Sequence, residues 1–362
     1  MEKLQRRLAV ARGDEAADLV VRGGMVFSVF TREWLEADVA IADGVVAGVG
    51  RYEGRESVDA SGQYVVPGFI DAHMHLESVK LMVVEFARLV LPLGTTAVVA
   101  DPHEIANVLG VDGVHWLLDA TADLQLDVYF MAPSCVPASP FESPRRALTP
   151  GDLESLMRRR RVLGLAEMMN FPGVMEGAPS ELEKLVLDGA QHVDGHAPGL
   201  LGRQLQAYAA AGIYSDHEAL TVEEGRERLR AGMWLLVREA SMARNLRALL
   251  PLVEEFGPWR IAFCTDDRDP EDIADSGHIN GMVREAVAAG VSPEDAVLMA
   301  SHHPALWHGL SRHGAIAPGY VADLLLLPDL VGFRPSTVTP PASSAPRCRR
   351  TQPRASTRTT RP

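Results

Sequence analysis

The chain has little cysteine and lysine, and it has no long apolar run. Its 362 residues include three cysteines and three lysines. Because Cys135, Cys264 and Cys348 form no paired motif, they fit a reducing cytosol, and we predict a cytoplasmic location. No segment has the ~18 uninterrupted apolar residues of a membrane span. The charged first stretch, MEKLQRRLAVARGDEAADLV, lacks the apolar core of a secretory signal, so no membrane partner is expected.

Positive charge is also scarce, except near the end of the sequence. The net charge of −13 at pH 7 argues against a general affinity for nucleic acid. By contrast, residues 334–362 hold seven arginines and no acidic residue, and consist almost wholly of Pro, Ser, Thr, Arg and Ala. This segment has too few apolar residues to form a core. We therefore predict a disordered or frame-shifted tail rather than a basic interaction tail.

The pattern of apolar runs predicts an α/β fold with a small β-domain. Residues 1–66 contain short alternating strands separated by Gly and Asp-Gly turns. After Pro67, eight apolar runs end in polar clusters and alternate with helical patterns. They span 69–75, 96–104, 127–137, 162–170, 192–198, 212–218, 233–241 and 260–267. Eight such strands can close a (β/α)8 TIM-type barrel, whereas an open doubly wound sheet is the alternative.

Four regions follow from this pattern. Residues 1–66 are expected to form the N-terminal part of a small β-sandwich, and residues 67–312 the barrel. Residues 313–333, before the tail at 334–362, are expected to supply a strand that returns to the β-domain, which is implied by the family resemblance given below and not by the pattern itself. Neither GxGxxG after the first strand nor GxxxxGK[ST] is present, so dinucleotide and P-loop binding are not supported.

The stretch PGFIDAHMHLES points to the chemistry. His73 and His75 are two residues apart at the end of a predicted strand, so their side chains would project to the same side. That arrangement suits a shared metal ion, although two hydrogen-bonded imidazoles at a strand end would explain this pair equally well.

Other strand ends carry the same residue types, and barrel enzymes place their chemistry at these C-terminal ends. The polar residues at these ends are His73, His75, Asp101, His103, Glu104, Glu167, His196, His217, Glu218, Asp266 and Asp267. Histidine and carboxylate ligands gathered at one barrel mouth predict a divalent-metal site.

Several stretches together resemble one family. They are FIDAHMHLES, VVADPHEIANVLG, VYFMAPSCVP, LGLAEMMNFPGV, DGHAPGL, SDHE and FCTDDRDP. In this order they resemble the adenine deaminases of the amidohydrolase superfamily, and the likeness runs from about Ala17 to Phe333. The resemblance implies metal-dependent hydrolysis of adenine to hypoxanthine and ammonia, a step of purine salvage, with adenine as small-molecule partner.

The resemblance also implies a metal centre of two divalent ions. Many amidohydrolases bridge their ions with a carboxylated lysine on the fourth strand, but no lysine of this chain falls at a strand end. Glu167 stands at that place, and a carboxylate can also span two cations. Four histidines are the remaining ligands that the resemblance implies: His73, His75, His196 and His217. Manganese or iron is expected, and zinc also suits these ligands.

The remaining assignments are less specific. The strand-eight aspartate would bind metal and accept a proton from water; we prefer Asp266, and Asp267 stays an alternative. Glu218 would protonate a ring nitrogen of the purine. Five further residues are candidate substrate contacts, for some of which an ion pair or a helix cap is an equally good explanation: Asp101, His103, Arg238, Ser241 and His278. Asp101 and His103 could instead belong to a second metal position.

Two other functions stay open at this point. One is hydrolysis of a cyclic amide, as in hydantoinases or dihydroorotases, against which Glu167 and the DPHE and CTDDR motifs argue. The other is an inactive metal-binding remnant, because the family pattern stops near Phe333 and the family's further C-terminal domain is not recognisable. Exposed apolar surface would then alter assembly, and a homo-oligomer is compatible with the sequence.

Overall fold

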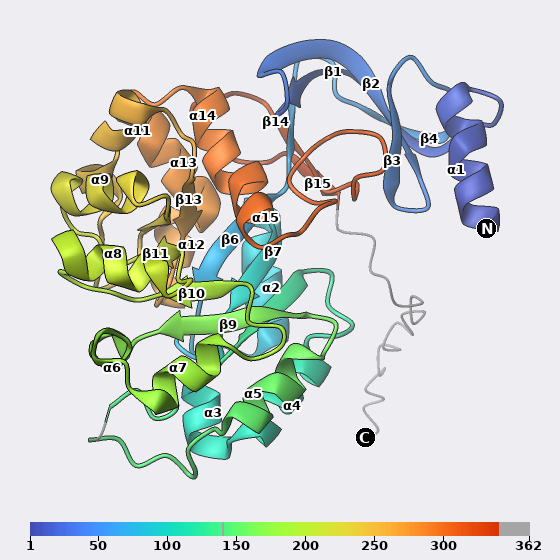
Figure 1. The fold of residues 1–362 in the computed structure, drawn as a ribbon. Helices are drawn as coiled ribbons and strands as arrows, with labels where there is room; N and C mark the ends of the chain where they lie inside the picture. The colour runs from blue at the N-terminus through green and yellow to red at the C-terminus, as the bar shows by residue number, and fades with distance from the viewer. Residues whose placement is uncertain (140, 340–362) are drawn as a thin grey trace, which may run out of the picture.

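Eight parallel strands form the centre of the molecule. A computed structural model describes residues 1–139 and 141–339 (Figure 1). Five strands lie in the order β10-β9-β8-β7-β6 and three in the order β11-β12-β13. Their bounds are β6 (Phe69–Met74), β7 (Thr95–Ala100), β8 (Asp127–Ala132), β9 (Val162–Met168), β10 (Val193–Gly195), β11 (Ser215–Asp216), β12 (Trp234–Arg238) and β13 (Ile261–Cys264). All eight strands begin within two or three residues of the predicted runs.

The two groups of strands meet on both sides, so the sheet curls round. Between β13 and β6, the Asp266 amide donates to the carbonyl of His73 at 3.0 Å. Between β10 and β11, the Gly195 amide donates to Ser215 Oγ at 3.1 Å. A Cβ atom at Gly195 would lie 2.1 Å from the Ser215 carbonyl oxygen, so only glycine permits this approach. The result is the TIM-like barrel that the sequence predicts.

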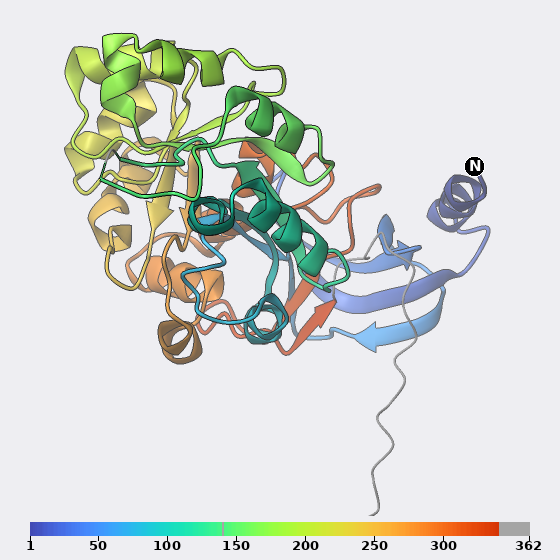
Figure 2. The same ribbon diagram turned by 90° about the horizontal axis from the view of Figure 1, so that it is seen from below.

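Helices surround the curled sheet (Figure 2). In α2 the side chains of Val83, Phe86, Ala87 and Val90 are buried, at the spacing of one helical face. The helices of the barrel are α2 (Val83–Val90), α3 (His103–Leu109), α4 (Val111–Ala120), α5 (Pro150–Met157), α6 (Phe171–Glu176), α7 (Pro179–Leu185), α8 (Gly202–Ala210), α9 (Val222–Arg230), α10 (Leu246–Leu249), α11 (Pro251–Phe256), α12 (Pro270–Ser276), α13 (Ile279–Ala288), α14 (Pro293–Val297) and α15 (His303–Trp307). A 3₁₀ turn (Leu91–Leu93) and a π turn (Leu298–His302) extend α2 and α14. Within the described part of the chain, no helix combines the length and the apolar character that crossing a bilayer requires.

A second sheet stands beside the barrel and contains both early and late segments (Figures 1 and 2). Its order is β15-β14-β5-β1-β2-β3, and β4 pairs with β1. The strands are β1 (Ala17–Ser28), β2 (Glu33–Ala42), β3 (Val45–Gly50), β4 (Gly54–Asp59), β5 (Tyr64–Pro67), β14 (Leu324–Leu327) and β15 (Thr337–Thr339), preceded by the helix α1 (Glu2–Arg12). Asp43 and Gly44, with φ of 53° and 73°, form the predicted Asp-Gly turn between β2 and β3.

Two expectations for this region need correction. The seven strands are hydrogen-bonded into one sheet, so the predicted sandwich of two layers is not confirmed. The predicted return strand is present, because β14 pairs antiparallel with β5. However, β15 also pairs with β14, although it lies in the segment 334–362 for which we predicted disorder. Backbone pairing needs no apolar side chains, so composition missed it; residues 340–362 lie outside the described part of the chain.

Candidate metal centre

The strand ends bring eight histidine and carboxylate side chains together, and we call this group the strand-end centre. Its members are His73, His75, Asp101, His103, Glu167, His196, His217 and Asp266. Most of them are buried, because each follows or ends an apolar strand that lies inside the barrel. All eight are among the strand-end residues that the sequence analysis singled out.

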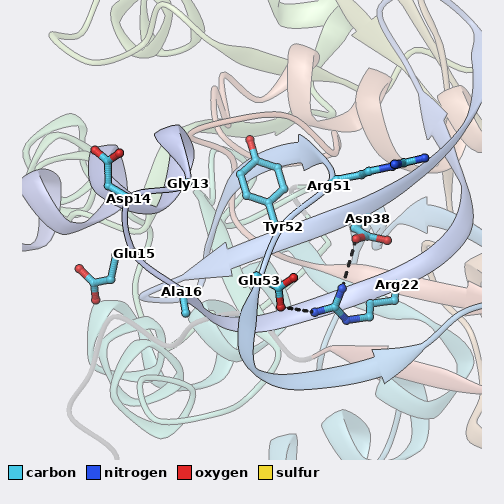
Figure 3. A pocket seen from close by; sticks show the side chains of 9 residues that line it. All are labelled: Gly13, Asp14, Glu15, Ala16, Arg22, Asp38, Arg51, Tyr52 and Glu53. Carbon is cyan, nitrogen blue, oxygen red and sulfur yellow. Dashed lines mark hydrogen bonds and ion pairs between the residues drawn. The ribbon is translucent and has the colours of Figure 1, made fainter.

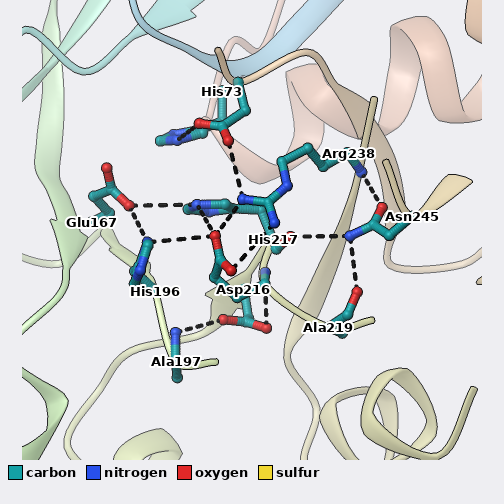
Figure 4. A network of polar contacts seen from close by, with 12 residues as sticks. His73, Glu167, His196, Ala197, Asp216, His217, Ala219, Arg238 and Asn245 are labelled. Atoms are coloured by element: carbon teal, nitrogen blue, oxygen red, sulfur yellow. Dashed lines mark hydrogen bonds and ion pairs between the residues drawn. The ribbon is translucent and has the colours of Figure 1, made fainter. Parts of the chain in front are cut away.

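Glu167, near the end of β9, contacts four histidines of the centre, of which Figure 4 shows His196 and His217. Its Oε1 lies 3.6 Å from His75 Nε2 and 3.5 Å from His103 Nδ1. Its Oε2 lies 2.6 Å from His196 Nδ1 and 3.4 Å from His217 Nε2. The two oxygens of one carboxylate therefore face two different pairs of histidines. This is the geometry that a carboxylate between two cations requires.

The structure distinguishes the two aspartates that follow β13. Asp266 Oδ1 lies 3.0 Å from His75 Nε2 and 3.6 Å from His73 Nε2, whereas Asp267 is exposed. The backbone of Asp266 has a φ of 54°, a left-handed conformation that is uncommon outside glycine. Such strained residues cluster at functional sites. Asp266 therefore lies beside both histidines, while a carboxylate oxygen of the exposed Asp267 also lies within 4.8 Å of a ring nitrogen of His75.

The charges of the centre suit a positively charged ligand. Burial raises the pKa of Glu167, but the hydrogen bond from His196 and the neighbouring imidazoles lower it well below its ordinary value. Burial likewise raises the pKa of Asp266, while the neighbouring imidazoles of His73 and His75 lower it far more. Both carboxylates are thus ionised at neutral pH in spite of their burial. Metal ligands must be in this deprotonated form.

Several buried polar atoms of the centre form no hydrogen bond with the described residues of the protein. They are His73 Nε2, His103 Nδ1, His217 Nδ1 and both carboxylate oxygens of Asp101. Buried polar atoms are almost always paired, so these atoms call for a ligand that the protein does not supply. Nitrogen and oxygen donors of this kind bind divalent metals. The residues therefore fit a metal ion.

The predicted substrate contacts divide into two groups. Arg238 Nη1 lies 3.0 Å from Asp266 Oδ2, and the same guanidinium also contacts the carboxylate of Glu218. Asp101 and His103 are part of the centre, with 3.3 Å between Asp101 Oδ2 and His103 Nδ1. The hydroxyl of Ser241, in contrast, already accepts a hydrogen bond from the backbone amide of Asp269, which joins two loops.

The expectation for His278 is wrong. Its ring is fully buried, and Nδ1 lies 2.8 Å from Oγ1 of Thr95, the first residue of β7. Asp101 follows the other end of the same strand. The contact with Thr95 therefore places the ring at the N-terminal end of β7, away from the centre. The SGHIN motif therefore does not reach a substrate at the strand ends.

Sequence reasoning missed residues that bond to the strand ends of the centre, of which Figure 4 labels Asn245. Asn245 accepts a bond from the Arg238 amide and donates to the carbonyl groups of His217 and Ala219. Arg228 of α9 donates to Asp216 Oδ2 at 2.8 Å and is fully buried. A charged residue in the helical pattern VEEGRERLRAG normally faces solvent, so no sequence signal marks it.

The geometry agrees with comparisons to known proteins. The model of the family described as the Amidohydrolase family matches residues 64–342. The chain belongs to the amidohydrolase family. It is similar to an adenine deaminase of Nitratidesulfovibrio vulgaris, with 50% identity over 90% of this chain and 57% of the relative. It is also similar to adenine deaminase 2 of Carboxydothermus hydrogenoformans, with 46% identity over 93% of this chain and 59% of the relative.

Solved structures show the same fold at low identity. A beta-aspartyl dipeptidase from Fervidobacterium islandicum superposes with a TM-score of 0.65 and 16% identity, over 89% of this chain and 95% of that one. The amidohydrolase fold predicted for the barrel is therefore confirmed. The chain spans a little under three fifths of the length of the adenine deaminases that it matches.

The pocket outlined in Figure 3 lies on the small sheet of this amidohydrolase and not at the strand ends. It is lined by Gly13, Asp14, Glu15, Ala16, Arg22, Asp38, Arg51, Tyr52 and Glu53. Arg22 pairs with Asp38 at 3.6 Å and with Glu53 at 3.4 Å. These charges satisfy one another, so we assign no chemistry to this pocket.

The support behind the centre yields a prediction about stability. Replacing Arg228 by alanine leaves the Asp216 carboxylate buried without its partner, which costs about 3–5 kcal/mol in comparable proteins. We expect that loss in the free energy of unfolding, measured by urea denaturation. Arg226, two residues earlier, pairs on the surface with Glu255, and its alanine variant is the matched control. Equal midpoints for the two variants would contradict this prediction.

Proposed function

We propose that this amidohydrolase hydrolyses adenine to hypoxanthine and ammonia in the cytoplasm, as a step of purine salvage. The observation that carries the proposal is the position of Glu167, whose two carboxylate oxygens face separate pairs of histidines. The similarity to proteins named adenine deaminase supports the choice of adenine over a cyclic amide. Adenine is then the small-molecule partner.

Two divalent cations, manganese or iron with zinc as an alternative, would occupy the centre. His73, His75 and Asp266 would hold one ion, His196 and His217 the other, and Glu167 would span both. When bound, such ions supply a nucleophile at neutral pH, because they lower the pKa of water from 15.7 towards about 7. Asp101 and His103 lie against Glu167 Oε1 and the His75 ring, so they would complete the first position.

The protein side chains would move the protons. Asp266 is ionised and lies beside His75, so its carboxylate can accept the proton of the attacking water. Arg238 holds the Asp266 and Glu218 carboxylates together, and Glu218 Oε1 lies 3.5 Å from His217 Nε2. Glu218 is therefore close enough to the centre to carry a proton to a ring nitrogen of the purine. Ammonia leaves after the amino group has accepted a proton.

Glu218 provides a test of this division of roles. In the Glu218→Gln variant the side chain keeps its size but cannot transfer a proton. We expect kcat for adenine to fall by about 10²–10⁴-fold, the usual contribution of general acid–base catalysis. The metal content should stay unchanged, because Glu218 is not among the proposed ligands. Loss of bound metal in this variant would contradict the proposal and would instead make Glu218 a ligand.

The function itself is tested by an ultraviolet assay of adenine conversion by the purified chain, with Mn(II) or Fe(II) added. We expect hypoxanthine to form with the metals and not after chelation, and a hydantoin to remain intact. Turnover of the hydantoin alone would favour the cyclic-amide function. Metal uptake without turnover of either compound would contradict the deaminase proposal for this chain. Gel filtration of the same sample would also report whether the chain forms a homo-oligomer.

A further inference from the structure

A second group of metal-ligating side chains lies inside the barrel and shares no residue with the strand-end centre. It consists of His192, Asp194 and His308, which we call the inner cluster. One candidate ligand atom from each residue lies within 4.8 Å of the other two. His192 and Asp194 belong to the start of β10, and His308 follows α15. The cluster therefore joins the barrel wall to the last helix of the barrel.

The ring of His308 is held in one orientation. Its Nε2 lies 2.7 Å from the carbonyl oxygen of Ala72, which can only accept, so Nε2 carries the hydrogen. The other ring nitrogen, Nδ1, is buried and has no partner. Histidines that bind metals usually donate their second nitrogen to a carbonyl group in this way. In the neutral ring, Nδ1 of His308 therefore carries a lone pair that can bind a metal ion.

Asp194 is prepared in a similar way. Its Oδ1 accepts hydrogen bonds from Trp307 Nε1 at 2.9 Å and from Ser215 Oγ at 3.0 Å. Its Oδ2 is buried and has no partner, and the residue is only 1% exposed. Donors on one oxygen fix the carboxylate plane and leave the second oxygen free. Asp194 and His308 are both buried, and each carries an acceptor atom that forms no hydrogen bond within the described residues.

His192 completes the set. Its Nε2 lies 3.6 Å from Asp194 Oδ1, which is too long for a hydrogen bond, and within the described part of the chain it forms no hydrogen bond. The ring of His192 packs against Trp307 at 4.1 Å between centroids, which keeps it beside the cluster.

We propose that the inner cluster binds one divalent cation of the zinc class, through His192, Asp194 and His308. Two imidazoles and one carboxylate form a ligand set typical of zinc, with one place left for water. The ion would connect β10 to the turn after α15 and would hold Trp307 against the inward side chains of the barrel. Its role is structural, and it is separate from any ion at the strand ends.

Elemental analysis of the whole chain, after chelation and dialysis against zinc, tests the proposal. The His308→Gln variant should hold one zinc ion fewer per chain than the parent protein. The His303→Gln variant is the matched control, because His303 is also a buried histidine of α15 but bonds only to the carbonyl of Ile261 and lies outside the cluster. Ions at the strand ends are present in all three proteins, so the difference reports the inner cluster alone.

Thermal unfolding gives a second measurement, because a ligand of the native state raises the midpoint. Zinc should protect the His303→Gln variant more than the His308→Gln variant. Equal zinc content in the two variants would overturn the proposal. If His308→Gln does not fold, anomalous diffraction from parent crystals at the zinc edge decides: a peak between the three side chains supports the site, and a water molecule or an empty position there overturns it.

Discussion

Replacing Glu167 by glutamine should abolish most adenine turnover and release metal from the strand-end centre. The amide keeps the size of the side chain but carries no charge, and only one of its two terminal atoms can bind a cation. Both histidine pairs around Glu167 would lose their shared partner. Loss of a residue that merely supports a ligand costs about 10–100-fold in affinity or activity. We expect the loss here to exceed about 100-fold, together with a fall from two bound ions per chain towards one.

Elemental analysis and the ultraviolet assay measure the two effects on one sample. Glu176→Gln is the matched control, because Glu176 is an exposed residue at the end of the short helix that follows β9. It should keep its metal and its activity. A Glu167→Gln protein that binds both ions and turns over adenine at the parent rate would remove the basis of the proposed function.

The second large effect is expected at the aspartate doublet after β13. Asp266→Asn should lower kcat for adenine by about 10²–10⁴-fold, since the amide cannot accept a proton from water. Asp267→Asn should stay within a few-fold of the parent, because its side chain is exposed while Asp266 contacts both His73 and His75. The pair of variants changes the same functional group at neighbouring positions.

The steady-state rate at saturating adenine is the measurement for this pair. Circular dichroism should show the same fold for both variants. If Asp267→Asn were instead the slower enzyme, the assignment of the proton transfer to Asp266 would be wrong. Equal losses would indicate that the doublet acts through the loop and not through one carboxylate.

The barrel and most of the centre could be predicted from the sequence because both follow from local patterns. An apolar run that ends in His or Asp predicts where a strand ends and which side chains lie at that end. The closing of eight strands into a ring then brings such ends together, as it does for His75 and Glu167. The sequence also shows that Glu167 lies at the end of the fourth strand and that no lysine falls at a strand end.

Other features depend on contacts that no local pattern contains. Arg228 is buried because a carboxylate of another strand end, Asp216, lies opposite to it. His278 was misplaced because the sequence shows that it sits in a loop, but not at which end of the barrel that loop lies. His308 belongs to none of the motifs that the sequence analysis singled out, and only the fold brings it to Asp194. The pairing of β15 depends on backbone hydrogen bonds and on the Thr339 hydroxyl, which composition cannot show.

The bond between the Asp266 amide and the His73 carbonyl closes the ring of strands. The same two residues provide side chains to one proposed ion, so that ion would fasten the seam between the first and last strands. With the ion bound, the contact between β13 and β6 would be harder to separate. Without the ion, it would be held by contacts of the protein itself, such as the backbone bond between Asp266 and His73. Loading of the metal and final closure of the cylinder would then be a single event in the maturation of the protein.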